Sequence, residues 1–385
     1  MIVKSLLDND QYKFTMQQAL LKLGYGAVPV RYKFKCRNKG IDFTKMAGDI
    51  FGEIMLLSEL MLTRDEYDYM RSLPYISEEY LQFLKYYRHD PDLIHMMLED
   101  DGTLVIEPEG SWFRTILLEV PILSIVSEVF GRYQPQENKN IETSRSVLKS
   151  NLAMLPDDLN FADFGTRRRH SYEWHDEVVQ TCKKKKGFVG TSNVHFAMMY
   201  GLKPIGTMAH EWLMAHQQLD YRVADSQKMA LENWIKVYRG NLGIALSDVI
   251  NTTAFLRDFS DPLFYKLFDG VREDSEPNPE AFGRKMIEFY KSRKIDPTTK
   301  TVVFSNGLDF SKMMYLHHVL RYHINVSFGI GTKLTNAWEY IPLNIVLKMV
   351  TCNGQPVAKI SNSPGKGMCE SESYINYIKE VYGVK

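Results

Sequence analysis

Three consecutive arginines, Arg167, Arg168 and Arg169, follow a short apolar run in the segment FGTRRRH (164–170). A guanidinium is a planar fork that matches the oxygens of a carboxylate or a phosphate. Three such groups at the end of a predicted strand favour an anion-binding site. The alternative interpretation is a solvated, charged loop, and these residues alone leave both interpretations open.

A single histidine, His210, follows another predicted strand end in the segment GTMAHEW (206–212). His216 lies six residues further on, so the pair lacks the spacing of the zinc-binding H-E-x-x-H helix. A lone histidine is commonly a structural hydrogen-bonding group. Its position after Gly206 and Thr207 also fits a nucleophile or an acid–base residue.

Four more clusters of small or polar residues are GTSN (190–193), which comes after the lysine run 183–186, LSD (246–248), FSNGLD (304–309) and FGIGTK (328–333). The last two follow apolar strands. Thr191 and Ser192 can offer hydroxyl and backbone N–H groups to a ligand. Asp248 can hold Mg²⁺ or a ribose hydroxyl, or it can cap the next helix. The glycines of the last two clusters permit close backbone approach to a phosphate. Together the clusters predict a site for a ligand with several negative charges.

The elements expected to position these clusters alternate between short strands and helices. Strands are predicted at 161–164, 203–206, 243–248, 300–305 and 325–329, with helices such as 226–238 and 310–321 between them. Such alternation is typical of parallel βα units, which can close into a barrel. In these folds the chemistry collects at the carboxyl ends of the strands, where the polar clusters lie.

The two ends of the chain have a different pattern. The N-terminal part predicts a helix from Tyr12 to Leu23 that stops at Gly24, a strand at 28–36, a mostly helical stretch at 42–98, a strand at 102–108 and a helix at 116–130. The C-terminal part predicts a strand at 343–350, a hairpin turn at Asn353-Gly354, a partner strand at 357–360 and a helix at 372–381. We expect this tail to complete the N-terminal domain.

Length and composition bound the class of protein. The 385 residues suggest two domains, or one barrel with an appendage, and a hydrophobic fraction of 44% supports a large core. The 47 Lys and Arg residues balance 47 Asp and Glu residues, so the net charge disfavours a nucleic-acid binder. Any anion site must therefore be local.

The cysteines and the N-terminal residues bear on the cellular compartment in which the protein is expected. The four cysteines are Cys36, Cys182, Cys352 and Cys369, and their spacing suggests neither a disulfide framework nor a zinc site. The first ten residues lack the apolar core of a signal peptide, and no run reaches about 18 uncharged apolar residues. We expect a cytoplasmic protein with no membrane partner.

Six segments together resemble the nicotinate phosphoribosyltransferases, most closely the bacterial and fungal type. They occur in the family's order and span most of the chain: LLDNDQYKFTMQQAL (6–20), FADFGTRRRHS (161–171), GTSN (190–193), KPIGTMAHEWLMAHQQ (203–218), GIALSDVINTTAFLRDF (243–259) and SFGIGTKLTN (327–336). The resemblance implies a type II phosphoribosyltransferase, with an irregular α/β barrel at 116–339. A mixed α/β domain at 1–115 would be completed by 340–385.

The resemblance also implies a reaction in the salvage route of NAD biosynthesis. Nicotinate and phosphoribosyl pyrophosphate would give nicotinate mononucleotide and pyrophosphate, a ligase or glycosyltransferase reaction that needs Mg²⁺. ATP hydrolysis would be coupled to it through phosphorylation of His210. A homodimer with shared active sites is implied, because Tyr12 matches a tyrosine that the neighbouring subunit stacks on the pyridine ring.

Further site residues carry over from the family motifs. Phe164 would stack on the pyridine, Arg167 would meet the base and phosphates with Arg168 or Arg169 assisting, and Thr191 and Ser192 would lie near the pyridine carboxylate. Asp248 would hold the ribose or the Mg²⁺–pyrophosphate. The remaining expected substrate contacts are Thr207, Ser305, Gly307, Gly329, Gly331 and Thr332, of which the last four would cradle the 5′-phosphate.

One departure from the family and three alternatives bear on this interpretation. Many relatives carry an aspartate where this chain has Ser305-Asn306, so a second carboxylate for Mg²⁺ is in question, although Asp309 is near in sequence. Within the superfamily the base could be nicotinamide or quinolinate. An inactive barrel that senses phosphoribosyl pyrophosphate or a nucleotide is the third alternative, which the presence of Arg167, His210 and Asp248 disfavours.

Overall fold

The computed structural model describes residues 1–219, 222–362 and 367–384. The chain divides into two compact units. Unit 1 comprises Met1–Asp158, Ala162–Gly206 and Ile330–Lys348, and unit 2 comprises Leu159–Phe161, Thr207–Gly329 and Met349–Lys385. The predicted domain boundaries at residues 115 and 339 rest on the family resemblance and stay a prediction.

Unit 1 contains an antiparallel sheet with β3 (Leu104–Ser111) between β1 (Pro29–Cys36) and β2 (Ile94–Leu98). Val30 pairs with Gly110, and Met96 pairs with Ile106. The strand predicted at 28–36 is confirmed, and its alternating Val30, Tyr32 and Phe34 are buried, as one face of a half-buried strand requires. In the full five-stranded order, β10 (Ile345–Cys352) lies beside β1 and β11 (Gln355–Pro356) lies at the edge.

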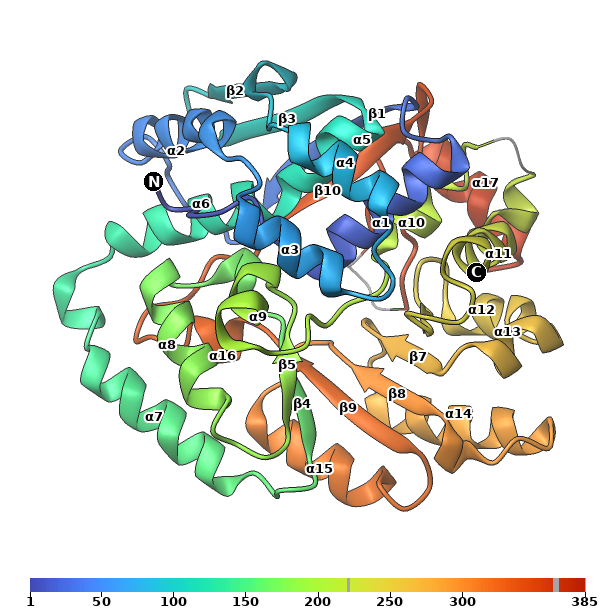
Figure 1. Cartoon of the computed structure of the whole chain (residues 1–385). Coiled ribbons are helices and arrows are strands. Elements are labelled where there is room, and N and C mark those ends of the chain that lie inside the picture. Colours follow the sequence, from blue (N-terminus) through green and yellow to red (C-terminus); the bar gives the residue numbers. More distant parts are fainter. Residues whose placement is uncertain (220–221, 363–366, 385) are drawn as a thin grey trace. The chain divides into compact units, whose positions relative to one another are not determined.

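Figure 1 shows the helices of unit 1. They are α1 (Gln11–Leu23), α2 (Ala47–Met55), α3 (Arg64–Ser72), α4 (Glu78–Tyr86), α5 (Trp112–Thr115), α6 (Glu119–Arg132), α7 (Ile141–Met154), α8 (Tyr172–Cys182), α9 (Val194–Tyr200) and α16 (Thr332–Thr335), with 3₁₀ turns η1 (Leu56–Glu59), η2 (Pro91–Leu93), η3 (Ile116–Leu118), η4 (Gln136–Asn138) and η5 (Thr166–Arg168). The predicted stop of α1 is confirmed, because Gly24 adopts a left-handed φ of 77° and its N–H closes the last turn. Apart from Arg132, every residue of α6 is buried, which makes this helix the centre of the unit's core.

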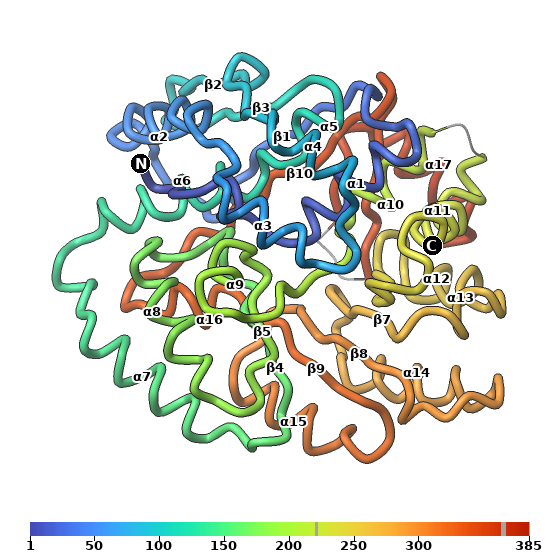
Figure 2. The backbone as a smooth tube through the Cα atoms, viewed as in Figure 1, coloured from blue at the N-terminus to red at the C-terminus, as the bar shows by residue number. Residues whose placement is uncertain are grey.

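Unit 2 is built on parallel strands that lie side by side in Figure 2. β6 (Ile244–Leu246), β7 (Gly270–Glu273), β8 (Thr301–Phe304) and β9 (Asn325–Ile330) pair in this order, with Val271 opposite Val302 and Phe304 opposite Phe328. The helices of unit 2 are α10 (His210–Ala215), α11 (Ser226–Tyr238), α12 (Thr252–Asp258), α13 (Pro262–Leu267), α14 (Pro279–Ser292), α15 (Phe310–Leu320) and α17 (Glu372–Tyr382), with 3₁₀ turns η6 (Val223–Asp225) and η7 (Pro297–Thr299).

The complete strand order of the second sheet is β5-β4-β9-β8-β7-β6, with β4 (Asn160–Asp163) and β5 (Phe188–Thr191). Parallel strands alternating with helices, beside an antiparallel sheet, confirm the predicted α/β class. The order has β5 and β6 at its two ends, so closure into a barrel stays a prediction.

Four strand assignments differ from those predicted. The segment 203–206 forms a single bridge, Thr191 to Pro204, because proline has no N–H to extend a ladder. β5 and β7 were not predicted, since β7 is four residues long and carries the charges of Arg272 and Glu273. β2 lies inside the stretch predicted as mostly helical.

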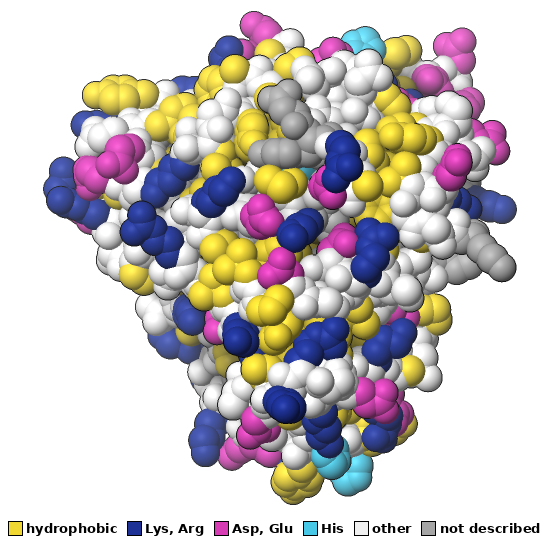
Figure 3. Space-filling model, turned by 90° about the vertical axis from the view of Figure 1, so that its right-hand side faces the viewer, with side chains coloured by type: hydrophobic (Ala, Val, Ile, Leu, Met, Phe, Trp, Pro, Cys, Tyr) yellow, Lys and Arg dark blue, Asp and Glu magenta, His cyan; other side chains and the backbone are white. Residues whose placement is uncertain are grey.

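The surface agrees with the balanced composition. On the face drawn in Figure 3, Lys and Arg side chains are interspersed with Asp and Glu side chains. Among the described residues, no helix combines the length and the apolar character that crossing a membrane requires.

Candidate active site

His210 lies at the centre of a polar cluster in unit 2. It is the first residue of α10 and is buried, and its Nε2 lies 2.9 Å from Asp248 Oδ1 and 3.7 Å from Asp274 Oδ2. Asp248 follows β6 and Asp274 follows β7, and these two strands are parallel neighbours. The carboxyl ends of parallel neighbours meet at one edge of the sheet, which is why the two acids reach the same histidine.

A fourth member of this cluster, Lys359, was not predicted from the sequence. Its Nζ lies 2.7 Å from His210 Nε2 and 2.9 Å from Asp248 Oδ2. Lys359 is 111 residues from Asp248 along the chain, in a segment without a recognisable motif. The available signal was the Asn353-Gly354 turn, which folds the following residues back along β10.

Burial and charge set the protonation of this cluster. Burial lowers the pKa of His210 to about 4, assisted by the Lys359 ammonium and opposed by Asp248. Burial alone would raise the pKa of Asp248, but His210 and Lys359 hold it well below its ordinary value. At neutral pH the His210 imidazole is therefore uncharged and the Asp248 carboxylate is ionised.

The same cluster does not fit a resident Mg²⁺ ion, although His210, Asp248 and Asp274 could each offer an atom within 4.8 Å of the others. Mg²⁺ prefers six oxygen ligands in a regular octahedron. Here one of three candidate ligands is a nitrogen, and the Lys359 ammonium already contacts two of the three residues. The predicted contact of Asp248 with Mg²⁺–pyrophosphate therefore concerns an ion that arrives with substrate, and it stays a prediction.

Asp274 places a second carboxylate beside Asp248 in this cluster, whereas the role of Ser305-Asn306 towards Mg²⁺ stays a prediction. Ser305 Oγ donates to Asp274 Oδ1 at 3.0 Å, so the serine joins the cluster through this acid. Asp309, the residue suggested by proximity in sequence, instead caps α15 by accepting a bond from Lys312 N at 2.8 Å. The signal that was missed is the segment VRED (271–274), an acid directly after a short strand.

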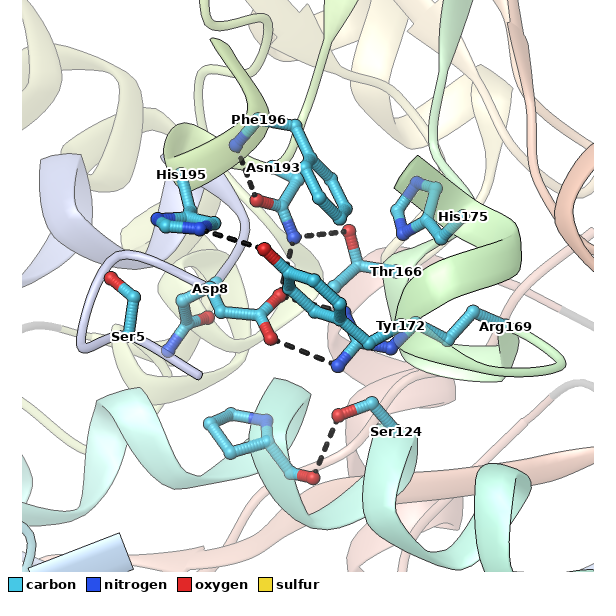
Figure 4. A network of polar contacts seen from close by, with 12 residues as sticks. Ser5, Asp8, Ser124, Thr166, Arg169, Tyr172, His175, Asn193, His195 and Phe196 are labelled. Atoms are coloured by element: carbon cyan, nitrogen blue, oxygen red, sulfur yellow. Dashed lines mark hydrogen bonds and ion pairs between the residues drawn. The ribbon is translucent and has the colours of Figure 1, made fainter. Parts of the chain in front are cut away.

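The three arginines of unit 1 have different surroundings. The Arg169 side chain is fully buried and forms two bonds to the Asp8 carboxylate, at 2.7 and 2.9 Å (Figure 4). Arg168 donates twice to the carbonyl oxygen of Ile345, at 3.0 and 2.8 Å. The Arg167 side chain is 37% exposed, whereas that of Arg169 is buried. The placement of Arg169 favours a structural role.

Arg167 lies among opposed charges. Its guanidinium is 3.8 Å from Asp10 and 3.5 Å from Glu119, and Glu119 also pairs with Lys13 at 2.7 Å and Lys348 at 3.5 Å. Burial by itself would raise the pKa of Glu119, but Lys13, Lys348 and Arg167 hold it well below its ordinary value. Three cations thus surround one buried carboxylate in unit 1.

Asp163, at the end of β4, joins the two loops predicted to bind the base. Its side chain accepts from Gly165 N at 2.8 Å, from Thr191 Oγ1 at 2.6 Å and from His175 Nε2 at 2.6 Å. Its carbonyl accepts from Ser192 N at 2.8 Å. The structure therefore brings the FGTRRRH and GTSN segments together, and sequence reasoning did not single out the aspartate that holds them.

The other predicted residues have the following places. Tyr12 lies on α1 and is buried, while Ser192 Oγ donates to Asp10 at 2.7 Å. Phe164 donates its backbone N–H to the carbonyl oxygen of Ile330 at 2.8 Å, and Gly331 and Thr332 lie at the start of α16.

The remaining predicted residues lie in unit 2. Thr207 Oγ1 donates to the Ile244 carbonyl at 2.8 Å, Gly307 has a left-handed φ of 54°, and Gly329 lies within β9.

Comparison with solved structures identifies the class of fold. A nicotinate phosphoribosyltransferase from Porphyromonas gingivalis gives a TM-score of 0.93 at 34% identity, with 100% of both chains covered. One from Vibrio cholerae gives a TM-score of 0.92 at 37% identity, covering 100% of this chain and 95% of that chain. The fold is therefore that of solved nicotinate phosphoribosyltransferases.

Comparison of sequences gives the family. Residues 7–127 match the nicotinate phosphoribosyltransferase (NAPRTase) N-terminal domain, and residues 159–385 match the nicotinate phosphoribosyltransferase (NAPRTase) family. The nicotinate phosphoribosyltransferase of Xanthomonas euvesicatoria pv. vesicatoria is 46% identical over 391 residues, which cover 100% of this chain and 98% of that protein. This chain belongs to the nicotinate phosphoribosyltransferase family, as its motifs predicted.

Proposed function

We propose that this protein transfers the phosphoribosyl group of phosphoribosyl pyrophosphate to nicotinate, with release of pyrophosphate, as a step of NAD salvage. The product is nicotinate mononucleotide, and ATP hydrolysis is coupled to the transfer through phosphorylation of His210. The observation that carries the proposal is a buried, uncharged His210 in contact with Asp248 and Lys359 in a chain of this family.

Transfer breaks the bond between ribose C1 and pyrophosphate and forms a bond from C1 to the pyridine nitrogen. Positive charge develops on the ribose ring, so the enzyme acts mainly by positioning the reactants and stabilising charge. The carboxylates of Asp248 and Asp274 are suited to hold ribose hydroxyls or the Mg²⁺ that accompanies pyrophosphate as substrate. Gly307, Gly329, Gly331 and Thr332 are proposed to bind the 5′-phosphate.

Coupling to ATP requires a nucleophilic nitrogen. The lone pair of His210 Nε2 attacks the γ-phosphorus, and the bond from this phosphorus to the bridging oxygen breaks as ADP leaves with that electron pair. The proton on Nδ1 then passes to water, and later hydrolysis returns phosphate and free histidine. A pKa of about 4 keeps the ring uncharged at neutral pH, as a nucleophile needs. The added negative charge changes the affinity for pyrophosphate.

The base is proposed to lie between Phe164 and Tyr12, with Arg167 facing its carboxylate and Thr191 and Ser192 beside it. The 37% exposure of Arg167 supports this assignment over Arg169, which is buried and bonded to Asp8. Arg168 donates twice to the Ile345 carbonyl and is proposed to assist. Donation of Tyr12 by a neighbouring subunit would make the protein a homodimer. We extend the proposal to a reducing cytoplasm, since all four cysteines are unpaired.

One assay tests the substrate and the coupling together. Purified protein receives phosphoribosyl pyrophosphate and Mg²⁺ with nicotinate, nicotinamide or quinolinate, each with and without ATP, while mononucleotide and pyrophosphate are measured. We expect turnover with nicotinate and stimulation by ATP. Turnover with nicotinamide or quinolinate in place of nicotinate would contradict the substrate, and equal rates with and without ATP would contradict the coupling.

A further inference from the structure

We infer that Lys359 is the cation of the phosphohistidine centre, taking the place that a metal ion would otherwise have between His210 and Asp248. The inference rests on the proposed function, because it concerns how His210 is phosphorylated. Its starting point is that one nitrogen, Nε2 of His210, lies within hydrogen-bond distance of both the Lys359 ammonium and the Asp248 carboxylate.

These two neighbours favour opposite tautomers of the imidazole. Asp248 can only accept, so its contact requires a proton on Nε2, whereas Lys359 can only donate and requires a lone pair there. The tautomer with the lone pair on Nε2 is the one that can attack phosphorus at this nitrogen. Lys359 therefore stabilises the reactive form of His210, and it also binds the Asp248 oxygen that does not contact the ring.

The backbone holds Lys359 in this place from two sides. The Gln217 side chain, two residues beyond the end of α10, accepts from Ala358 N and donates to Ala358 O, both at 2.8 Å. On the other side, Ile360 N donates to the carbonyl of Val249 at 2.8 Å. The residues on either side of Lys359 are thus fixed to the segments that carry His210 and Asp248.

Charge explains why a cation is needed after phosphoryl transfer. A phosphoryl group on Nε2 places anionic oxygens beside the carboxylates of Asp248 and Asp274. Arg272 is paired with Asp274 at 3.9 Å, whereas Lys359 contacts His210 itself. The flexible lysine stem lets the ammonium follow the oxygens as the group forms. Lys359 is thus a catalytic residue of the phosphorylation step.

The first test measures the phosphoenzyme formed from γ-labelled ATP with Mg²⁺, in the full-length wild-type protein and in Lys359→Met, Lys359→Arg and His210→Ala. We expect Lys359→Met to be phosphorylated roughly 100-fold more slowly, the order of effect seen when one preorganised donor is removed. Lys359→Arg should recover part of the rate. Lys300→Met is the matched control, because this buried lysine of unit 2 donates to the carbonyls of Lys266 and Phe268.

The outcomes separate the inference from the proposed function. Labelling of Lys359→Met at the wild-type rate, with the thermal midpoint measured in parallel, would overturn the role of Lys359 while leaving the phosphohistidine intact. An unlabelled wild type, or a labelled His210→Ala, would overturn the ATP coupling itself and the inference with it.

A second measurement does not depend on activity. Mn²⁺ binding to the enzyme alone, followed by electron paramagnetic resonance, should reveal no tight site in the wild type at the His210 cluster. Lys359→Ala should gain one, since three candidate ligands within 4.8 Å lose the competing ammonium. Tight Mn²⁺ binding by the wild type that His210→Ala removes would show that a metal ion, and not Lys359, is the cation of this centre.

Discussion

At the scale of single residues, neighbouring arginines of one motif differ because their partners differ. Arg169 contacts Asp8 and lies 3.9 Å from Glu128, while Arg167 is part of a more open group with Asp10 and Glu119. The sequence predicted that the run binds anions, and for Arg169 the anion is a carboxylate of the protein itself. Which arginine faces inward depends on partners such as Asp8, which is 161 positions from Arg169, so the motif alone could not tell them apart.

Loss of Arg169 should therefore reduce stability more than substrate affinity. We expect Arg169→Met to lower the free energy of unfolding by about 3–5 kcal/mol, because Asp8 becomes an uncompensated buried charge. Denaturant unfolding of this variant and of the double variant Asp8→Asn/Arg169→Met measures the effect. The double variant should be less destabilised than Arg169→Met, and an equal or larger loss would contradict the paired-charge explanation.

Loss of Arg167 should reduce activity with nicotinate more than it reduces stability. We expect Arg167→Ala to lower kcat/KM for nicotinate by about 100-fold, since one charge-assisted contact to an anion is worth roughly 1.5–3 kcal/mol. Its thermal midpoint should fall less than that of Arg169→Met, because the side chain is 37% exposed and Glu119 keeps Lys13 and Lys348 as partners. Unchanged kcat/KM would rule out contact between Arg167 and substrate.

At the scale of elements, the sequence predicted α1, β1, β9, α11 and α15 well, because each has clear periodicity or a clear stop signal. It missed β5 and β7, which are four residues long, and with them the position of Asp274 at a strand end. Lys359 was missed for a different reason. Its role arises from pairing between segments distant in sequence, which neither spacing nor composition reveals.

Asp163 provides a test at this scale, because it connects the loops after β4 and β5. In Asp163→Asn an amide nitrogen would replace one of the accepting oxygens, so Gly165 N, or Thr191 Oγ1 and His175, would lose an acceptor. We expect KM for nicotinate to rise about tenfold as the loops move apart, consistent with a loss near 1.4 kcal/mol. His175→Gln is the companion variant, and a larger change in kcat than in KM for Asp163→Asn would argue against a positioning role.

At the scale of the whole molecule, buried histidines link stability to pH. Burial lowers the pKa values of His89 and His216 to about 4 each, from an ordinary value of 6.5. Between about pH 6.5 and 4 the unfolded chain therefore binds more protons than the folded chain, so stability is lost as pH falls through this window. Above it, these two groups contribute no pH dependence.

Thermal midpoints measured from pH 7.5 to 5 should accordingly fall towards the acid end. Each of the two histidines contributes a slope of at most about 1.4 kcal/mol per pH unit. His89→Gln should reduce the steepness of the loss, since a neutral side chain cannot take up a proton on unfolding. A steeper loss in this variant, or midpoints that rise between pH 6.5 and 5, would contradict the assignment of buried, uncharged histidines.

The most direct test of the account is the location of the phosphoryl group during turnover. The protein would be incubated with ATP, Mg²⁺, phosphoribosyl pyrophosphate and nicotinate, quenched at alkaline pH, and mapped by mass spectrometry while mononucleotide is measured in the same sample. We predict one phosphoryl group on His210 and ATP-stimulated formation of nicotinate mononucleotide, both lost in His210→Ala. ATP-stimulated nucleotide formation in His210→Ala, or a phosphoryl group on another residue, would contradict the account.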